Sequence, residues 1–357
     1  MFRILFDNPI VCKDMEEIDA MLSEKNLLYG QSIYISGASG MIASYITAYL
    51  IWLNERYSAD IQIFVGVRSK EKAKNRFGAY AQKEYFHILE QDVNLPIICA
   101  QHFDYMIHAA SLASPQYYGC NPVETMLPNV IGTNTLLIRA RHDGVKGFLF
   151  FSSGSVYGTI DNGGIIKEEN RGLFDFLHRG NVYGESKRCG EALCTAYYNE
   201  YQVPVKIARI YHTYGPTADI ENDTRVFSEF VKSILHNNSI IIRSTGEDRR
   251  SFCYISDAAV GLLKILLSGE KGEVYNMGNP YTFVSINELA NLLVETFPEY
   301  HLQIIREKRN DKGYNASPEK RIASVSTEKL EHLGWKPSVS IQEGFLRMIR
   351  GIEYDGT

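Results

Sequence analysis

Short apolar runs alternate with longer segments of mixed polarity over the first 210 residues. The runs span five to seven positions and are rich in Ile, Val, Phe and Tyr, which is typical of buried strands. The longer segments are typical of helices that pack on a sheet. This alternation predicts an α/β fold with a doubly wound parallel sheet that helices cover on both faces. The expected strands are 32–36, 61–67, 86–90, 105–109, 148–152 and 205–210, and the expected helices are 41–55, 69–81, 122–142 and 183–201.

The alternation becomes less regular after residue 210. We therefore expect three parts: an extension over 1–30, the sheet domain over 31–210, and a smaller C-terminal α/β lobe over 211–357 that interleaves with the end of the sheet. The pattern assigns no role to the extension. Helices of the lobe are expected near 224–236, 256–268, 285–297 and 341–350.

Composition narrows the class of protein. The chain has 357 residues, 45% of them hydrophobic, which is enough for a large core. Its net charge of −5, without a long basic block, argues against a nucleic-acid partner. The six cysteines show no metal-ligand spacing and indicate reduced thiols, so we expect a cytoplasmic protein without a metal site. The apolar run 46–53 is too short to cross a bilayer, so no membrane contact is expected.

A glycine-rich turn follows the first expected strand and opens a helix. Its sequence is Gly37-Ala38-Ser39-Gly40-Met41-Ile42-Ala43. Gly37 permits a tight turn, and Gly40 lets the backbone approach a pyrophosphate at the positive helix N-terminus. In this context the motif predicts the dinucleotide site of a Rossmann-type fold.

The end of the second expected strand leaves the choice between NAD and NADP open. An acid that would bond the ribose hydroxyls of NAD is absent from Val67-Arg68-Ser69-Lys70. Arg68 and Lys70 could contact a 2′-phosphate instead. Alternatively, Arg68 stacks on the adenine and does not select either cofactor.

Tyr183 and Lys187 stand four residues apart on one face of an expected helix. An ammonium so close is expected to lower the tyrosine pKa, and such a tyrosine can take a proton from an alcohol while a hydride leaves the same carbon. The pattern is weak by itself. It gains weight from the segment 152–158 at the end of the fifth strand, where Ser153 could share a proton with Tyr183 and a substrate alcohol.

Taken together, the motifs resemble the extended short-chain dehydrogenases/reductases of the nucleotide-sugar epimerase/dehydratase group over about 32–348. The segments that carry this resemblance are 37–43, 92–93, 107–110, 129–133, 183–187, 209–216, 276–278 and 333–335. The resemblance implies an NAD(P)-binding domain over 31–210 and a nucleotide-sugar-binding lobe over 211–357. It implies that NAD or NADP is bound by Gly37, Ser39, Gly40, Met41, Ile42, Arg68, Asp92, Val93, Ala109, Ala110, Ser111, Asn129, Tyr183 and Lys187.

Within this group the pattern is most similar to UDP-glucuronate decarboxylases. The similar segments are 113–118, 121–122, 224–226, 250–252 and the region of Arg321. The resemblance implies a nucleoside-diphosphate sugar, most readily a UDP-sugar, as the partner. It also implies a homodimer paired through helices 122–142 and 183–201. The implied substrate-binding residues are Ser114, Ser155, His212, Arg225, Arg250 and Arg321.

One departure from the group decides the expected reaction. Decarboxylases and dehydratases of the group carry an acid just before Val-Tyr-Gly, where this chain has Gly154 and Ser155. A serine cannot replace a carboxylic acid in an elimination. What remains is reversible oxidation at sugar C4 by Ser153, Tyr183 and Lys187, and 4-epimerisation is its simplest outcome. Decarboxylation of UDP-glucuronate, reduction of a 4-keto sugar and a cofactor-binding regulator stay as alternatives. His212 stands where the group has Asn.

Overall fold

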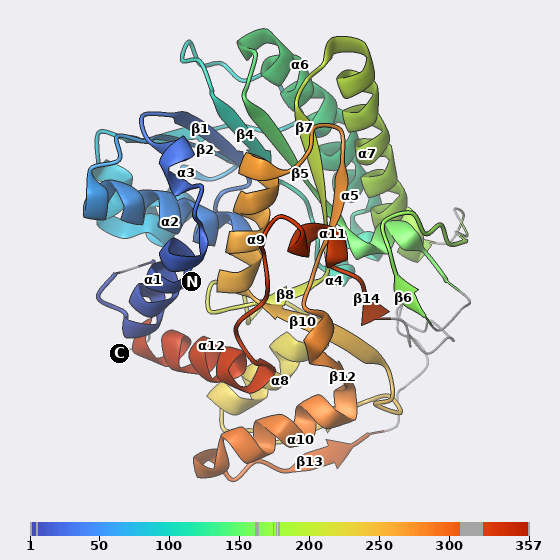
Figure 1. The fold of residues 1–357 in the computed structure, drawn as a ribbon. Helices are drawn as coiled ribbons and strands as arrows, with labels where there is room; N and C mark the ends of the chain where they lie inside the picture. The colour runs from blue at the N-terminus through green and yellow to red at the C-terminus, as the bar shows by residue number, and fades with distance from the viewer. Residues whose placement is uncertain are drawn as a thin grey trace.

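A seven-stranded parallel sheet forms the centre of the molecule in the computed structural model (Figure 1), which describes residues 2–4, 6–160, 164–173, 175, 177, 179–307 and 324–355. The strand order is β3-β2-β1-β4-β5-β7-β11, and every neighbouring pair is parallel. All carboxyl ends therefore meet at one edge, and the order reverses between β1 and β4, where ligands bind in such sheets. The expected doubly wound α/β fold is confirmed. The strands are β1 (Ser32–Ser36), β2 (Gln62–Val67), β3 (Phe86–Glu90), β4 (Tyr105–His108), β5 (Gly147–Ser153), β7 (Val205–Ile210) and β11 (Val274–Met277).

Helices cover both faces of this sheet because successive strand side chains point to opposite sides. In β5, Leu149 and Phe151 join the core under α2 and α9, whereas Phe148 and Phe150 join a second core under α6 and α7. The covering helices are α2 (Met41–Tyr57), α3 (Lys70–Phe77), α5 (Pro122–Leu127), α6 (Thr133–Asp143), α7 (Val182–Tyr201) and α9 (Ile255–Ser268).

Two expected helices are interrupted. The helix expected over 122–142 contains a π-helical turn, Pro128–Gly132, between α5 and α6. Pro128 has no N–H to donate, so the regular pattern changes there. The helix expected over 69–81 ends at Phe77, because Gly78 takes a φ of +54° and a 3₁₀ turn (Gly78–Gln82) follows.

The C-terminal residues build a smaller lobe and also return to the central sheet. A three-stranded sheet of order β12-β10-β8 and the parallel pair β13-β9 lie in the lobe, whereas α9 and β11 belong to the central sheet. The lobe elements are β8 (His212–Tyr214), α8 (Val226–Leu235), β9 (Ile240–Ile242), β10 (Arg249–Tyr254), β12 (Phe283–Ser285), α10 (Ile286–Thr296), β13 (Ile304–Arg306) and α12 (Ile341–Asp355). Shorter elements are α4 (Pro115–Cys120), β6 (Ile165–Ile166), β14 (Ser324–Val325) and α11 (Glu328–Glu331), with 3₁₀ turns at Lys25–Leu28, Gly154–Tyr157, Arg179–Asn181, Pro280–Thr282 and Pro298–Tyr300.

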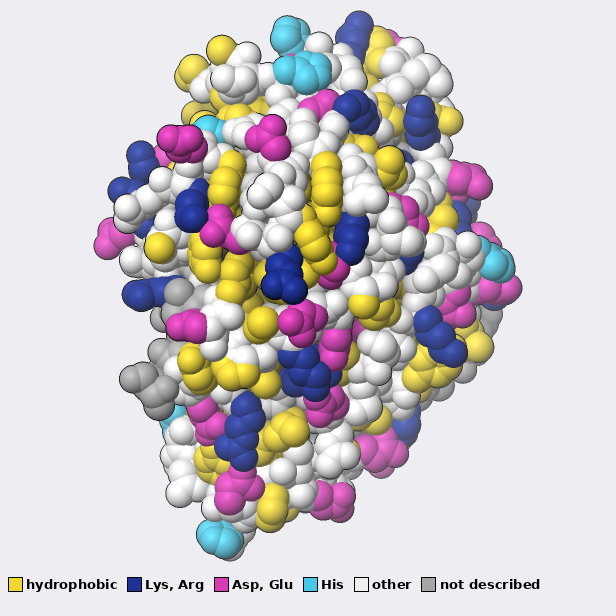
Figure 2. All heavy atoms as spheres, turned by 60° about the vertical axis from the view of Figure 1, so that its left-hand side comes forward, with side chains coloured by type: hydrophobic (Ala, Val, Ile, Leu, Met, Phe, Trp, Pro, Cys, Tyr) yellow, Lys and Arg dark blue, Asp and Glu magenta, His cyan; other side chains and the backbone are white. Residues whose placement is uncertain are grey.

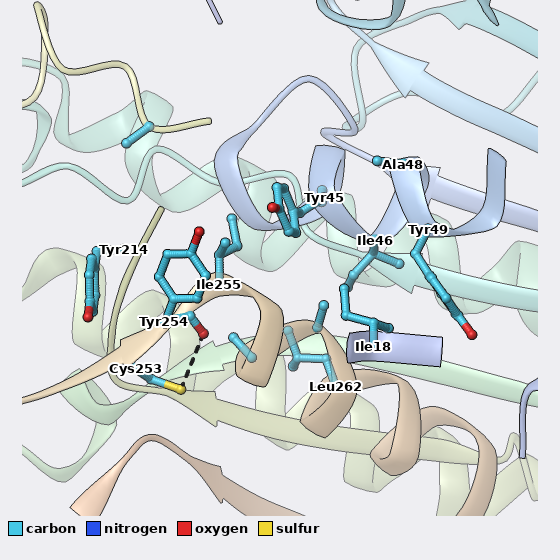
Figure 3. Close-up of a cluster of buried hydrophobic side chains, with 14 of the residues drawn as sticks. Ile18, Tyr45, Ile46, Ala48, Tyr49, Tyr214, Cys253, Tyr254, Ile255 and Leu262 are labelled. Carbon is cyan, nitrogen blue, oxygen red and sulfur yellow. Dashed lines mark hydrogen bonds between the residues drawn. The ribbon is translucent and has the colours of Figure 1, made fainter. Parts of the chain in front are cut away.

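The N-terminal residues form helix α1 (Pro9–Met21), which packs against α2, α9 and α12. Figure 3 shows Ile18 of α1 beside Ile46 of α2 and Leu262 of α9. The segment expected as an extension of unknown role is thus part of the main core. It joins the sheet domain to the lobe.

The outer face near the two termini carries acidic and basic side chains next to one another (Figure 2). Within the described ranges, no helix is long and apolar enough to cross a membrane.

Candidate active site

The glycine turn after β1 is forced by close packing. Gly37 has a φ of +65°, and a Cβ there would lie 2.7 Å from the Cα of Ala110. Its N–H donates to the Gly66 carbonyl (2.8 Å), and the N–H of Gly40 donates back to the Gly37 carbonyl (2.9 Å). Helix α2 starts directly afterwards at Met41. Its N–H groups therefore open toward the carboxyl edge of the sheet, where an anion would be stabilised.

A buried histidine ties this turn to the next strand. The hydroxyl oxygen of Ser36 lies 2.9 Å from His108 Nδ1. The same oxygen accepts hydrogen bonds from the N–H groups of Ala109 (3.1 Å) and Ala110 (3.2 Å). His108 Nε2 lies 3.0 Å from the Pro128 carbonyl, which can only accept, so the proton is on Nε2. Burial, followed by the charge of Lys187, lowers the pKa of His108 to about 3. This neutral imidazole fixes the backbone at the site.

Three buried oxygens near the carboxyl edge have no hydrogen-bond partner within the described residues. They are Ser111 Oγ, Ser114 Oγ and Asn129 Oδ1. The amide nitrogen of Asn129 is held by the Thr125 carbonyl and by Ser186 Oγ, both at 2.9 Å. Since buried polar atoms are normally paired, these unpaired oxygens suit a polar ligand.

These features fit a dinucleotide cofactor. The turn of Gly37, Ser39 and Gly40 with Met41 and Ile42 suits a pyrophosphate, and the oxygens of Ser111 and Asn129 suit the polar groups beyond it. The remaining predicted contacts lie around the same edge. Arg68 and Asp92 are exposed at the ends of β2 and β3, and Val93 is buried against Gly132, where a Cβ would lie 2.9 Å from Val93 Cγ1.

The predicted catalytic hydroxyls lie together at the end of β5. The hydroxyl of Ser153 donates to Ser155 Oγ (3.2 Å), and Ser153 lies close enough to Tyr183 to lower the tyrosine pKa. The ring of Tyr118, from the short helix α4, stacks on Tyr183 with centroids 4.7 Å apart and an interplanar angle of 8°. Tyr118 is therefore an additional member of the site. It lies in the loop 113–118 that the sequence marked, but the sequence did not place it on Tyr183.

The expected lowering of the Tyr183 pKa is wrong for this arrangement. Burial raises the pKa of Tyr183 to about 12, although the nearby Ser153 hydroxyl and the charge of Arg225 act downward. Lys187 is directed elsewhere: its Nζ donates to the Phe151 carbonyl (2.6 Å) and lies 5.7 Å from the Tyr183 ring centroid. Burial also lowers the pKa of Lys187 to about 7, so a smaller fraction of Lys187 is charged at neutral pH than the sequence led us to expect.

Of the predicted substrate-binding arginines, Arg225 lies close enough to Tyr183 for its charge to lower the tyrosine pKa. It precedes α8, pairs with Asp223 (2.6 Å between Nη2 and Oδ2) and acts on the pKa of Tyr183 through its charge. Arg250, at the start of β10, donates to Asp248 (3.0 Å).

The other predicted substrate-binding residues occupy different places. Ser114 stands at the N-cap position of α4 without a side-chain capping bond, Ser155 is exposed beside Ser153, and His212 in β8 lies opposite Phe252. Arg321 lies outside the described residues. Within those residues, no group of three His, Cys, Asp or Glu side chains is arranged to hold a metal ion.

A buried carboxylate that the sequence did not single out lies behind the hydroxyls. Glu191 accepts from Arg209 Nε (3.0 Å) and Nη2 (2.8 Å) and from the hydroxyl of Ser152. A signal was present, because Glu191 stands four residues beyond Lys187 and so continues the same face of α7.

Comparisons with known proteins agree with this geometry. The family model of the NAD-dependent epimerase/dehydratase family matches residues 33–278. UDP-glucuronic acid decarboxylase 3 of Arabidopsis thaliana is 33% identical over 318 residues, which are 87% of this chain and 86% of the relative. UDP-glucuronic acid decarboxylase 1 of Danio rerio is 30% identical over 334 residues, covering 92% and 73%.

Solved structures share the fold. UDP-glucuronic acid 4-epimerase from Bacillus cereus, in complex with UDP-glucuronic acid and NAD, superposes with a TM-score of 0.74 at 21% identity, covering 90% of this chain and 99% of that one. UDP-glucose 4-epimerase from Thermotoga maritima, with UDP-glucose, gives a TM-score of 0.74 at 22% identity over 91% and 99%.

Proposed function

Because the chain belongs to the NAD-dependent epimerase/dehydratase family, we propose that it oxidises a nucleotide sugar transiently at C4 and acts as a 4-epimerase. The observation that carries this proposal is the group of hydroxyls at the end of β5, where Ser153 donates to Ser155 and lies close enough to Tyr183 to lower its pKa. The segment 152–158 supplies hydroxyls for proton transfer and contains no carboxylic acid for an elimination. NAD, when bound, supplies the chemistry of accepting a hydride and returning it.

Tyr183 exchanges the proton of the C4 hydroxyl, with Ser153 as relay. Its pKa of about 12 means that the phenol holds its proton at neutral pH, which suits return of a proton to the sugar. Removal of the first proton requires this pKa to fall. Ser153 and Arg225 already act in that direction, so a ligand that draws them closer to the phenol would strengthen the base.

The proposed substrate is a UDP-sugar. Relatives and neighbours named for UDP-sugars support this class, and Arg225 supplies a planar guanidinium suited to phosphate oxygens near Tyr183. Ser114, Ser155, His212, Arg250 and Arg321 are the further proposed contacts. The test is a panel of the UDP-derivatives of glucose, galactose, N-acetylglucosamine and the two uronic acids, with products separated by chromatography. A 4-epimer is expected from at least one of them, and no conversion of any sugar would refute the proposal.

UDP-glucuronate decarboxylation is the second candidate. Its support is the 33% identity over 318 residues to a decarboxylase. A 4-keto uronic acid is a β-keto acid that loses carbon dioxide readily, so the missing acid at Ser155 need not prevent it. The same panel decides between the two reactions. UDP-galacturonate from UDP-glucuronate indicates epimerisation, whereas UDP-xylose with release of carbon dioxide indicates decarboxylation.

The proposed oligomer is a cytoplasmic homodimer. An exposed apolar row runs along α5, the π-helical turn and α6, which pack on α7. Its members are Val123 (59% exposed), Met126 (39%), Leu127 (39%), Ile131 (45%) and Ile138 (55%). Such a row is more readily explained if a second copy covers it. Light scattering should report twice the mass of 40.5 kDa, and Ile138→Glu should shift it toward the monomer.

A further inference from the structure

We propose that Glu191 is a positioning residue for the C4 chemistry: clamped by Arg209 and Ser152, it maintains the ammonium of Lys187 and the orientation of Ser153 next to Tyr183. This inference rests on the proposed function. In this role Glu191 does not contact the reacting atoms, since it acts through Lys187 and Ser153.

Helix α7 and strand β5 are joined by three successive contacts. Tyr183, Lys187 and Glu191 are spaced by four residues and so form one stripe along α7. Three consecutive residues of β5 face this stripe. The carbonyl of Phe151 accepts from Lys187 (2.6 Å), Ser152 donates to Glu191, and Ser153 lies close enough to Tyr183 to lower its pKa. A shift of Glu191 would therefore move the strand end that presents the relay hydroxyl.

Glu191 is held more rigidly than a surface carboxylate. Its two oxygens receive the planar fork of Arg209, at 3.0 and 2.8 Å, which is the bidentate geometry that orients both groups. Arg209 is the partner of Ser152 in the β5–β7 register, so two adjacent strands hold the carboxylate. The remaining amino group of Arg209 donates to Tyr157 (3.0 Å), whose hydroxyl donates to Asn276 (2.7 Å) in β11.

Among the groups that act on Lys187, Glu191 is the buried carboxylate that favours the charged amine. Lys187 is buried against the ring of Phe150, 5.0 Å from its centroid, and burial disfavours the ammonium. The charge on Glu191 of the same helix acts in the opposite direction, whereas burial raises the pKa of the Cys194 thiol and keeps it neutral. His108 of β4 faces Lys187 but is neutral, and Tyr183 holds its proton. Removal of the Glu191 charge would thus leave Lys187 uncharged at neutral pH.

The test uses two variants that break the same ion pair from opposite sides. Glu191→Gln removes the anion and Arg209→Gln removes the cation. The full-length proteins are labelled with ¹³Cε-lysine, the Lys187 signal is assigned with Lys187→Met, and the signal is titrated by NMR. If Glu191 sets the charge of Lys187, its pKa of about 7 falls by about one pH unit or more in Glu191→Gln and does not fall in Arg209→Gln. Equal shifts in both variants, or none, would overturn the inference.

Turnover of the best sugar of the panel is a second readout. Glu191→Gln should reduce kcat by about tenfold relative to the wild type at pH 7.5, in line with one pH unit, while KM stays within about twofold. If the wild type converts none of the sugars, the proposed function is wrong, and the NMR titration still decides the role of Glu191. Should Glu191→Gln fail to fold, the double variant with Gln at both positions replaces it. Its Lys187 must still titrate below the wild type, and a wild-type pKa there would refute the inference.

Discussion

Two clusters of charged residues in this protein, each with buried groups at its centre, have opposite imbalances of charge. The catalytic cluster, made by Lys187, Glu191 and Arg209, has two cations for one carboxylate. The N-terminal cluster, made by Asp14, Glu17, Glu343 and Arg347, has three carboxylates for one guanidinium. In each cluster burial pushes one member toward its neutral form, and the partners in contact with it oppose that shift. Burial lowers the pKa of Lys187 to about 7 against the charge of Glu191, and burial raises the pKa of Asp14 to about 6 against its hydrogen bonds and the charge of Arg347.

The two clusters have different effects because they lie in different parts of the fold. The catalytic cluster lies behind the strand end that presents Ser153 to Tyr183, so its charge acts on a reaction site. The N-terminal cluster joins helices from distant parts of the chain. Asp14 of α1 accepts from Tyr45 of α2, from Tyr254 of β10 (2.8 Å) and from Arg347 of α12 (2.8 Å). Figure 3 shows the hydroxyls of Tyr45 and Tyr254 directed toward one another. This cluster fastens the N-terminal segment to both the sheet domain and the lobe.

The largest expected effect is on turnover, at the catalytic cluster, with little effect on stability. Tyr183→Phe removes the proton-exchanging oxygen but keeps the ring that stacks on Tyr118, so turnover should fall by about 10²- to 10⁴-fold with little change in unfolding. Steady-state rates on the active sugar, together with NAD binding measured by fluorescence titration, check this. Turnover at the wild-type rate would exclude Tyr183 as the proton-transfer residue.

The next effect is on stability at the N-terminal end. Arg347→Met leaves Asp14 buried without its cation and should lower the free energy of unfolding by about 3 kcal/mol, measured by urea denaturation. Arg350→Met is the matched control on the same helix. Arg350 is 43% exposed and pairs with Glu299 and Glu353, so its loss should cost no more than about 1 kcal/mol. Equal losses in the two variants would show that Asp14 does not depend on Arg347.

The smallest effect tests the direction in which folding shifts the pKa of Asp14. Its folded-state pKa of about 6 lies above the ordinary 3.8, so the protonated form stabilises the fold at low pH, and this contribution is lost as the pH rises through about 6. Asn cannot titrate. The stability advantage of the wild type over Asp14→Asn should therefore shrink by about 2 kcal/mol between pH 4.5 and pH 7.5.

A control of opposite sign is available for this test. Burial by itself would raise the pKa of Asp223. The hydrogen bonds and the charge of Arg225 outweigh this effect, so the pKa of Asp223 is lowered. The stabilising contribution of Asp223 is lost as the pH falls, and the advantage over Asp223→Asn should shrink toward low pH. The measurement is urea unfolding of the wild type, Asp14→Asn and Asp223→Asn at both pH values. A pH-independent difference for Asp14→Asn would mean that Asp14 does not titrate differently in the folded protein.

Much of the sheet domain could be predicted from local pattern. All six expected strands form, because runs such as 32–36 and 148–152 are apolar on both faces and can only be buried between helices. The tight turn at Gly37 was predicted correctly, since Gly37 takes a φ of +65°, whereas its close approach to Ala110 was not predicted. The π-helical turn at Pro128 was missed, although the proline itself was the signal.

Less of the candidate site than of the sheet domain could be predicted from the sequence. The spacing of Tyr183 and Lys187 predicted a shared helix face, but the direction of the tyrosine pKa was wrong because helical spacing carries no information on burial. Glu191 was overlooked because its partners Ser152 and Arg209 come from two other strands. The roles assigned to Arg250 and His212 stay predictions.

The sequence by itself determined the order of strands and helices, the glycine turn and the set of hydroxyls at the end of β5, because each depends on neighbours within a few residues. The tertiary structure alone decided which charges are buried together. Asp14 and Arg347 meet across 333 positions of the chain, and Ser152 meets Glu191 across 39. The free energy of a buried charge depends on its distance to every other charge and to water, and those distances exist only once the chain is folded.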